Sequence, residues 1–327
     1  MRSGSGRRTL RIVAALAALG VGSVAYGAYR RDIRAARARI ASGGLIAETR
    51  CGPIEYAAVG EGAPVLLVHG AGGGYDQGLD LGAPIAAMGL RIIAMSRFGY
   101  LRTPLPRDAS AAAQADAHAA LLDALGIAEA AIFGASAGAP SALQFALRHP
   151  QRCKALVLLV PAAYVPRAGG APSIAPRAWA TLLFDTALRS DFLFWSAMRI
   201  VRPTVIRALL GTSPEVIVHA SATEQARVAT MLEHILPVSA RRAGLVNEVV
   251  VTSTLERYDL ERIAAPTLAI SAADCLYGTF DAARYTADHI AGARFIGFPN
   301  GGHLCVGHHE EIAREIAAFL KAAFPCG

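Results

Sequence analysis

The stretch Gly134-Ala135-Ser136-Ala137-Gly138 is the most informative part of this sequence. It forms a G-x-S-x-G pattern that follows an apolar run, residues 130–133, and opens a helix-like run, residues 137–148. A strand, a sharp turn and a helix in this order make a nucleophile elbow, in which the serine hydroxyl stands exposed above a sheet. The alternative is a helix N-terminus at which Ser136 is only the capping residue.

Outward from this motif, strand-like and helix-like runs alternate along the chain. The strand-like runs are residues 54–59, 64–69, 91–96, 130–135, 155–160, 267–271 and 293–298, and the helix-like runs are residues 111–125, 137–148, 281–290 and 310–324. Several of the strand-like runs are continuously apolar, which is typical of a parallel sheet that is buried on both faces. The alternation therefore predicts an α/β fold with a doubly wound, mostly parallel sheet.

One long stretch interrupts the alternation. Residues 162–256 contain no convincing strand, only helix-like runs such as 178–188, 192–210 and 221–235. We expect a helical insertion here, part of which faces the carboxyl edge of the sheet, where open α/β sheets place their sites. The expected organisation is an N-terminal segment at 1–44, an α/β core at 45–161 and 257–327, and a helical cap at 162–256.

The positive charge of the chain is concentrated at its N-terminus. Residues 1–39 hold nine arginines and one acid, Asp32, for a net charge of +8, whereas the whole chain carries +7. The remaining residues therefore sum to −1. A nearly neutral body leaves no basic stripe for nucleic acid, so nucleic-acid binding is not expected.

The same N-terminus predicts a membrane anchor. Residues 12–28 form an uncharged stretch of mostly Ala, Val, Leu and Gly, with arginines on both sides. Its 17 residues are at the short end for spanning a bilayer. The alternative is a signal peptide, which would leave a secreted or periplasmic protein; Ala25-Tyr26-Gly27 matches a small-residue cleavage site poorly. Positive charge on both flanks leaves the orientation open.

The cysteines indicate neither a disulfide framework nor a metal site. There are five of them, an odd number, at wide spacing and without a C-x-x-C pair. We expect no metal and no cofactor.

Acyl transfer by a serine needs a base, an acid that orients the base, and donors for the developing oxyanion. In Asn300-Gly301-Gly302-His303, which follows the last expected strand, His303 is the expected base for Ser136; the alternative is a histidine that stabilises the loop. His308 and His309 start the last helix, where we expect them to cap it or to be solvated.

The oxyanion donors are expected in a glycine-rich loop. An apolar run, residues 65–68, leads into His69-Gly70-Ala71-Gly72-Gly73-Gly74. The backbone N–H groups of Ala71 (or Gly72) and of Ala137 are the expected oxyanion hole. A phosphate cradle is the rival interpretation, but the G-K-[ST] signature of such loops is missing.

On these residues the chain resembles the α/β-hydrolase superfamily, of the capped type with a serine nucleophile. The resemblance covers about residues 45–325. It implies that Ser136 is the nucleophile, that His303 is the base, and that the N–H groups of Ala71 and Ala137 form the oxyanion hole. Such a triad works without a cofactor.

The acid is where the sequence departs from that family. The family usually places G-x-x-D after a strand that begins Pro-Thr-Leu, whereas here Pro266-Thr267-Leu268 leads to Ala272-Ala273-Asp274-Cys275. We expect Asp274 to be the acid, with the loop absorbing an offset of one residue. In strict register Cys275 stands at the acid position instead, and the triad lacks its carboxylate. Cys275 and Cys305 either lie close enough to pair or are two buried small apolar residues.

The expected function is that of a serine hydrolase that cleaves small or medium, apolar carboxylic esters through an acyl-enzyme. Serine at the elbow counts against the dehalogenases and epoxide hydrolases of similar families, which use aspartate. Alternatives within the capped serine families are C–C bond hydrolases of ring-cleavage products, lactonases and acyltransferases. An alternative of another class is a ligand-binding protein with an impaired triad, motivated by the displaced acid.

Overall fold

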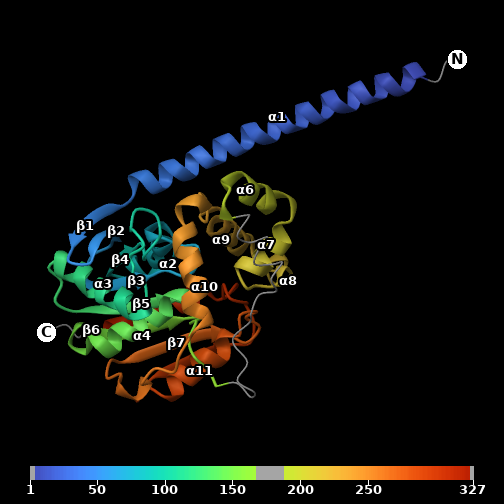
Figure 1. Ribbon diagram of the computed structural model, residues 1–327. Helices are drawn as coiled ribbons and strands as arrows, with labels where there is room; N and C mark the ends of the chain where they lie inside the picture. Colours follow the sequence, from blue (N-terminus) through green and yellow to red (C-terminus); the bar gives the residue numbers. More distant parts are fainter. Residues whose placement is uncertain (1–3, 167–187, 325–327) are drawn as a thin grey trace.

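The computed structural model describes residues 4–166 and 188–324, and of residues 4–19 and 21 only the backbone. Within these residues eight strands form one sheet, in the order β1-β2-β4-β3-β5-β6-β7-β8 (Figure 1). Their bounds are β1 Leu45–Thr49, β2 Gly52–Val59, β3 Ala63–Val68, β4 Leu90–Met95, β5 Ala130–Ala135, β6 Cys153–Leu159, β7 Thr267–Ala272 and β8 Arg294–Phe298.

The sheet is mostly parallel, as predicted. β3 pairs in parallel with β4 and β5, and the parallel pairing continues through β6, β7 and β8. β1 and β2 form an antiparallel hairpin at one edge, and β2 pairs antiparallel with β4. The sequence did not predict β1, because only one of its five residues, Ala47, is buried and so it lacks an apolar run.

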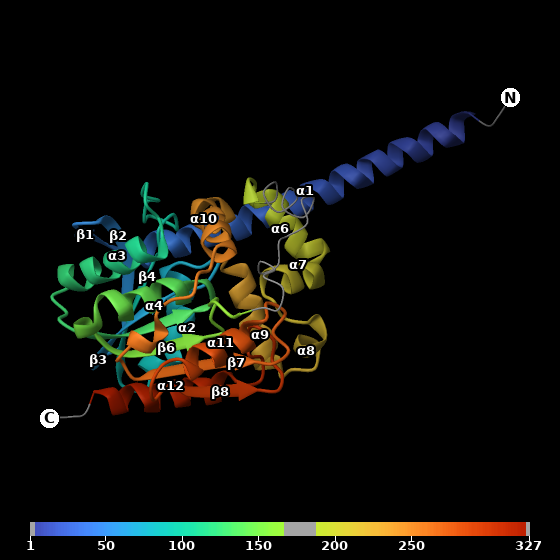
Figure 2. The same ribbon diagram turned by 60° about the horizontal axis from the view of Figure 1, so that its bottom comes forward.

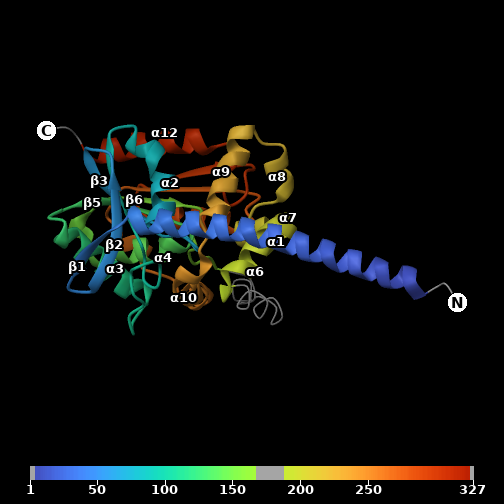
Figure 3. The same ribbon diagram turned by 90° about the horizontal axis from the view of Figure 1, so that it is seen from above.

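Helices cover both faces of the sheet. α2 (Tyr75–Ala86) and α12 (His309–Ala323) lie on one face, and α3 (Ala111–Ala124) and α4 (Ala139–Arg148) on the other (Figure 3). α11 (Thr279–Asp288) packs into the same core as α3 and α4. Alternate residues of β3 serve the two cores: Val65 and Leu67 pack with α2 and α12, and Leu66 and Val68 pack with α3 and α4. Both faces are apolar, which is why such strands appear in the sequence as continuous hydrophobic runs.

Helix α2 was not predicted from the sequence, and its glycines explain why. It contains Gly78, Gly82 and Pro84, all poor helix formers. A Cβ on Gly78 would lie 2.8 Å from the Ala94 Cβ, and one on Gly82 would lie 2.6 Å from Ile92 Cγ2. The glycines let the helix lie very close to β4, so packing against the sheet outweighs helix propensity.

Between β6 and β7 the described residues form helices and no strand. They are α6 Asp191–Ile200, α7 Arg202–Leu209, α8 Pro214–Val218, α9 Ala222–Glu233 and α10 Arg242–Ser253. We call these helices the cap; they gather over one end of the sheet (Figure 2). The run predicted at 192–210 divides at Val201, because Pro203 suits the first turn of a new helix. The run predicted at 178–188 lies, except for its last residue, outside the described residues.

Helix α1 (Gly4–Ser42) is 39 residues long, and its last turns pack on the cap (Figures 1 and 3). Ile33 and Ala36 are each only 3% exposed. The Asp32 carboxylate accepts hydrogen bonds from Trp195 Nε1 (3.0 Å) and from Arg199 (2.7 Å), both on α6. The last turns of α1 therefore belong to the packed body of the protein.

The predicted membrane anchor gains no support from the structure. Among the described residues, no helix combines the length and the apolar character that crossing a membrane requires.

Candidate active site

Ser136 lies on a sharp turn at the carboxyl end of β5. A short 3-10 turn, Ser136–Gly138, joins β5 to α4, and Ser136 has a φ of 48°, a left-handed conformation that L-residues rarely adopt. A Cβ on Gly134 would lie 2.7 Å from the Ala142 Cβ, and one on Gly138 only 2.4 Å from the Val68 carbonyl oxygen. Glycine is needed on both sides of Ser136 because α4 and β3 approach so closely.

The loop after β8 brings His303 to this serine. His303 Nε2 lies 2.9 Å from Ser136 Oγ. Burial lowers the pKa of His303 to about 4, so the imidazole is neutral near pH 7 and able to accept a proton. The Tyr277 ring packs edge-on against it, with 4.9 Å between ring centroids, and the His303 backbone N–H donates to the Gly211 carbonyl in the cap. The structure thus joins the two residues that the sequence predicted as nucleophile and base.

The expected contact between Asp274 and His303 is not made. Cys275 Sγ lies 3.3 Å from His303 Nδ1, at the position of the acid. The Asp274 carboxylate instead accepts hydrogen bonds from the backbone N–H groups of Gly302 (2.7 Å) and Gly301 (3.2 Å). The turn after β7 is tight, with the Cys275 N–H donating to the Ala272 carbonyl, and it does not absorb the offset of one residue. Cys275 therefore stands at the acid position, as strict register requires, and Asp274 holds the backbone of the loop that precedes His303.

Two hydroxyls that the sequence analysis missed lie behind Cys275. Thr279 Oγ1 donates to Cys275 Sγ (3.0 Å), and Ser271 Oγ lies 2.9 Å from Thr279 Oγ1. Both side chains are buried. Single Ser and Thr residues in apolar surroundings carry no pattern that would have identified them.

Cys275 and Cys305 are free thiols, so the disulfide considered for them is not formed. Burial raises the pKa of Cys305 to about 12, which leaves it protonated and unreactive as a nucleophile. His308 and His309 lie at the start of α12, as predicted, but neither role expected for them is observed. His308 makes no capping hydrogen bond and stacks on Phe298, and His309 is half-buried and lines the cavity beside Ser136.

The N–H groups of Ala71 and Ala137 are available as oxyanion donors. Neither has a hydrogen-bond partner in the described part of the chain, and both residues line the same cavity as Ser136. The N–H of Gly72, the alternative donor, is already engaged with the Tyr100 hydroxyl (3.3 Å). Of the two loop donors proposed from the sequence, Ala71 is therefore the free one.

His69 shapes this loop from inside. It is fully buried; its Nε2 accepts the Arg97 backbone N–H (3.0 Å), which leaves Nδ1–H to donate to the Gly70 carbonyl (2.7 Å). Burial first, and the nearby charge of Arg97 second, hold the pKa of His69 well below its usual range. A permanently neutral histidine in the turn suits an oxyanion loop better than a phosphate cradle.

A cavity of about 400 Å³ opens beside Ser136 and His303 between core and cap. Its apolar lining includes Leu81, Leu159, Val160, Leu209, Leu210, Met231, Val249, Leu255 and Ile312. Arg227 is the one arginine or lysine among its described lining residues, and its side chain is already bound to groups of the protein. Its guanidinium donates twice to Glu224 (2.8 Å each) and once to the Leu304 carbonyl (3.0 Å).

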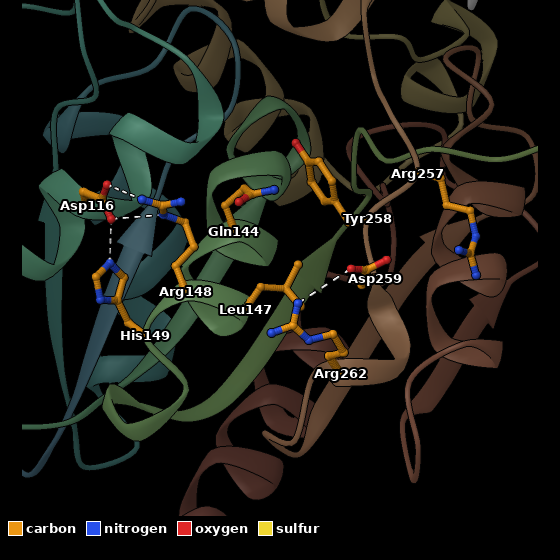
Figure 4. A pocket seen from close by; sticks show the side chains of 9 residues that line it. All are labelled: Asp116, Gln144, Leu147, Arg148, His149, Arg257, Tyr258, Asp259 and Arg262. Carbon is orange, nitrogen blue, oxygen red and sulfur yellow. Dashed lines mark hydrogen bonds and ion pairs between the residues drawn. The ribbon is translucent and has the colours of Figure 1, made fainter.

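A larger hollow, of about 570 Å³, lies elsewhere, between α4 and residues 257–262 (Figure 4). Its arginines are all in ion pairs: Arg148 with Asp116 (2.6 Å), Arg262 with Asp259 (3.7 Å), and Arg257 with Glu261. The nine residues labelled in Figure 4 include no serine and no cysteine. The smaller cavity, which holds the Ser136–His303 pair, is therefore the candidate active site.

Sequence comparison with known proteins finds similarity to hydrolases. The chain is 40% identical over 103 residues to a 2-hydroxymuconate semialdehyde hydrolase of Pseudomonas putida; the match covers 31% of this chain and 37% of the relative. It is 29% identical to a putative carbamate hydrolase, RutD, of Klebsiella pneumoniae (strain 342), over 75% of this chain and 86% of the relative. The first of these matches thus spans little more than a third of the relative's length.

Solved hydrolase structures are similar to this chain over most of its length. An alpha/beta hydrolase fold protein from Nakamurella multipartita superposes with a TM-score of 0.67 at 29% identity, covering 86% of this chain and 99% of that one. An esterase from Exiguobacterium antarcticum superposes with a TM-score of 0.64 at 19% identity, over 85% and 99% of the two chains, which supports the fold alone. The family model for the alpha/beta hydrolase fold matches residues 63–307, and the chain therefore belongs to the alpha/beta hydrolase family.

Proposed function

We propose that this hydrolase cleaves neutral, apolar carboxylic esters with Ser136 as nucleophile. The observation that carries the proposal is the contact of 2.9 Å between Ser136 Oγ and the buried, neutral His303, beside two N–H groups that have no partner among the described residues. Ser136 attacks the ester carbonyl while His303 takes its proton, and the N–H groups of Ala71 and Ala137 stabilise the oxyanion. His303 then protonates the leaving alcohol, and water hydrolyses the acyl-enzyme by the same steps.

In this proposal Cys275 stands where a carboxylate usually orients the histidine. The Cys275 sulfur can accept the Nδ1–H of His303, but it is not the carboxylate that stabilises the imidazolium in such triads. Replacing the carboxylate of such a triad with a neutral group costs about 10⁴-fold in kcat in the best-studied case, chiefly because the histidine tautomer is wrong. We therefore expect turnover to depend on Ser136 but to be slow for this fold.

The charge of the cavity supports a neutral substrate. Arg227 already binds a carboxylate of the protein, that of Glu224, and burial lowers the pKa of His309. A substrate carboxylate would thus meet no free cation among the described lining residues, and burying an unpaired charge is costly. This favours simple esters over the carboxylate-bearing dienoates that occur in the names of several relatives.

C–C bond hydrolysis of ring-cleavage products is the second candidate. It is favoured by relatives named as 2-hydroxymuconate semialdehyde hydrolase and 2-hydroxy-6-oxo-6-phenylhexa-2,4-dienoate hydrolase, at 40% and 32% identity over about a third of the chain. The same serine and histidine would serve that reaction, but the substrate would need a counter-ion.

A matched pair of substrates tests the proposal with the full chain. We expect p-nitrophenyl butyrate to be hydrolysed with a kcat/KM at least about tenfold above that of mono-p-nitrophenyl succinate, its carboxylate-bearing analogue, since desolvating an unpaired charge opposes binding. Activity should vanish in Ser136→Ala. A dienoate ring-cleavage product turned over faster than either ester would establish the second candidate. If the wild type is as inert as Ser136→Ala on all three, the protein is a ligand-binding member of the fold.

Membrane attachment stays a proposal that rests on residues 12–28 of the sequence. Washing cell membranes with sodium carbonate tests it: an integral anchor keeps the full chain in the pellet, whereas a chain that begins at Tyr29 is released. Release of the full chain would contradict the anchor.

A further inference from the structure

Arg97 is a buried arginine that contacts both segments that supply the expected oxyanion donors. It lies two residues after the end of β4, at the carboxyl edge of the sheet that also carries Ser136. Its Nη1 donates to the Ala137 carbonyl (3.0 Å) and its Nη2 to the Gly70 carbonyl (3.3 Å). The two planar N–H groups of one guanidinium thus connect the elbow to the glycine-rich loop.

The Gly70 carbonyl belongs to the peptide unit whose N–H is that of Ala71. It accepts hydrogen bonds from His69 Nδ1 (2.7 Å), Arg97 Nη2 (3.3 Å) and the Gly73 N–H (3.3 Å). Donors on a carbonyl fix the plane of its peptide and polarise the N–H at the other end, because neighbouring hydrogen bonds strengthen one another. The direction and the strength of the Ala71 donor therefore depend on Arg97.

Arg97 is in turn held by the cap. Its guanidinium forms a buried ion pair with Glu248 on α10. Two backbone hydrogen bonds seat the cap on the residues that follow Arg97: Gly244 N–H donates to the Gly99 carbonyl (2.9 Å), and Leu101 N–H donates to the Ala240 carbonyl (2.8 Å). The Tyr100 ring also lies under the guanidinium, 5.4 Å from it. Residues of both the core and the cap thus hold this side chain.

We propose that Arg97, held by Glu248 of the cap, is a positioning residue that aligns the oxyanion hole by fixing the Gly70–Ala71 peptide and the elbow at Ala137. Arg97 touches no substrate atom and acts through these two carbonyls. This role rests on the proposed serine chemistry. It means that the position of the cap affects the orientation of the oxyanion donors through the Glu248–Arg97 ion pair. A cap helix that only closed the cavity would need no such contact.

A transition-state analogue separates this role from a merely structural one. A trifluoromethyl ketone forms a hemiketal with Ser136 whose oxyanion occupies the hole, whereas KM reports ground-state binding of the ester. Arg97→Lys keeps a buried positive charge but loses the planar fork. We expect it to lower kcat and the affinity for the ketone by about 30-fold each, less than the 10²–10³-fold loss of a whole oxyanion donor, with KM changed less than about threefold.

Arg102→Lys is the matched control. Arg102 also pairs with a buried carboxylate, Glu55, but it binds the Gly44 carbonyl rather than the oxyanion loop. We expect its kcat and ketone affinity to stay within about threefold of the wild type. Glu248→Gln, which keeps the side-chain shape but loses the charge, should shift kcat and ketone affinity in the same direction as Arg97→Lys. It also keeps the test open if Arg97→Lys folds poorly in thermal melts.

The outcomes distinguish the two proposals. If ester turnover depends on Ser136 but Arg97→Lys and Glu248→Gln lose no more ketone affinity than Arg102→Lys, the inference about Arg97 is wrong and the serine chemistry stands. If ketone binding and turnover are the same in the wild type and in Ser136→Ala, the serine chemistry is wrong, and the alignment of an oxyanion hole by Arg97 is wrong with it.

Discussion

At the scale of single residues, the chemistry of the site depends on what faces His303 Nδ1. A carboxylate there accepts a hydrogen bond and cannot donate one, so it allows a single tautomer, with Nε2 free to take the Ser136 proton. Cys275 has both an S–H donor and an acceptor sulfur, so it allows either tautomer. The hydroxyl of Thr279 occupies one side of this sulfur.

Replacing this thiol with a carboxylate is the first prediction. We expect Cys275→Asp to raise kcat for an ester by at least about tenfold, because a charged acceptor selects the productive tautomer and stabilises the imidazolium. The measurement is steady-state hydrolysis of p-nitrophenyl butyrate. Cys305→Ser, a change at the other buried thiol near the site, is the control and should give no gain. A Cys275→Asp variant that folds and is slower than the wild type would mean that the sulfur does more than fill the acid position.

The pH profile gives a second prediction. The base must be neutral, and burial lowers the pKa of His303 to about 4, so kcat/KM should fall only as the pH drops through about 4. In Cys275→Asp the nearby negative charge favours the imidazolium, and the acid limb should move upward toward the usual histidine range. Pre-incubated samples assayed at neutral pH show whether loss at low pH is reversible titration or unfolding. A wild-type acid limb near pH 6.5 would contradict a buried, uncompensated histidine.

At the scale of secondary-structure elements, the sequence failed to predict helix α2, because α2 forms through close packing on the sheet and not through helix propensity. Helix α2 escaped prediction because Gly78 and Gly82 lower its helix propensity. Gly82→Ala should destabilise the protein by about 1–3 kcal/mol, because the new Cβ would lie 2.6 Å from Ile92 Cγ2. Gly27→Ala in α1, where nothing lies within 4 Å of the added Cβ, should be neutral or slightly stabilising. Chemical denaturation measures both, and equal effects would show that propensity and not packing governs α2.

The end of α1 leads to a fourth prediction, on truncation. A chain that begins at Leu45 loses the buried side chains of Ile33 and Ala36 and the partners of Trp195 and Arg199. Burial of one large apolar side chain alone contributes about 1.5–3 kcal/mol. We therefore expect its midpoint of thermal unfolding to fall by at least about 5 °C. A chain that begins at Ser23 keeps these contacts and is the control. Equal midpoints for both truncated chains would show that the contacts of α1 add nothing to stability.

At the scale of the whole molecule, buried neutral histidines link stability to pH. Burial, and then the charges of Arg97 and His149, lower the pKa of His118 to about 3, while an unfolded chain has the ordinary value of 6.5. Below pH 6.5 the unfolded state binds a proton that the folded state refuses, so stability is full above pH 6.5 and falls as the pH drops toward 3.

His118→Gln tests this linkage. It removes the titrating group and keeps an N–H donor for Ser141, so the free energy of unfolding should fall less steeply between pH 7 and pH 5 than in the wild type. Urea titrations at several pH values measure the slope. His219→Gln, at an exposed position, is the control and should follow the wild type. An unchanged slope in His118→Gln would rule out this histidine as a source of acid sensitivity.

The sequence predicted the parallel sheet, the elbow and the histidine loop because each rests on a local signal. Continuous apolar runs mark strands buried on both faces, and Gly134 and Gly138 mark a close approach of backbone. It did not reveal Arg97, Glu248 or Thr279, since their partners lie far away in the chain or are buried hydroxyls. The predicted contact between Asp274 and His303 is not made, because the tight turn after β7 keeps strict register and brings Cys275 to His303 instead.

We propose that Ser136, with His303 as its base, is a working nucleophile although no carboxylate faces His303. Covalent labelling of the full chain by a fluorophosphonate, followed by intact mass, tests it most directly. We predict one adduct on the wild type, none on Ser136→Ala, and labelling at least about 100-fold slower on His303→Ala, because the base is lost. Labelling of the wild type no faster than that of Ser136→Ala would show that Ser136 is not an activated nucleophile, whatever the fold.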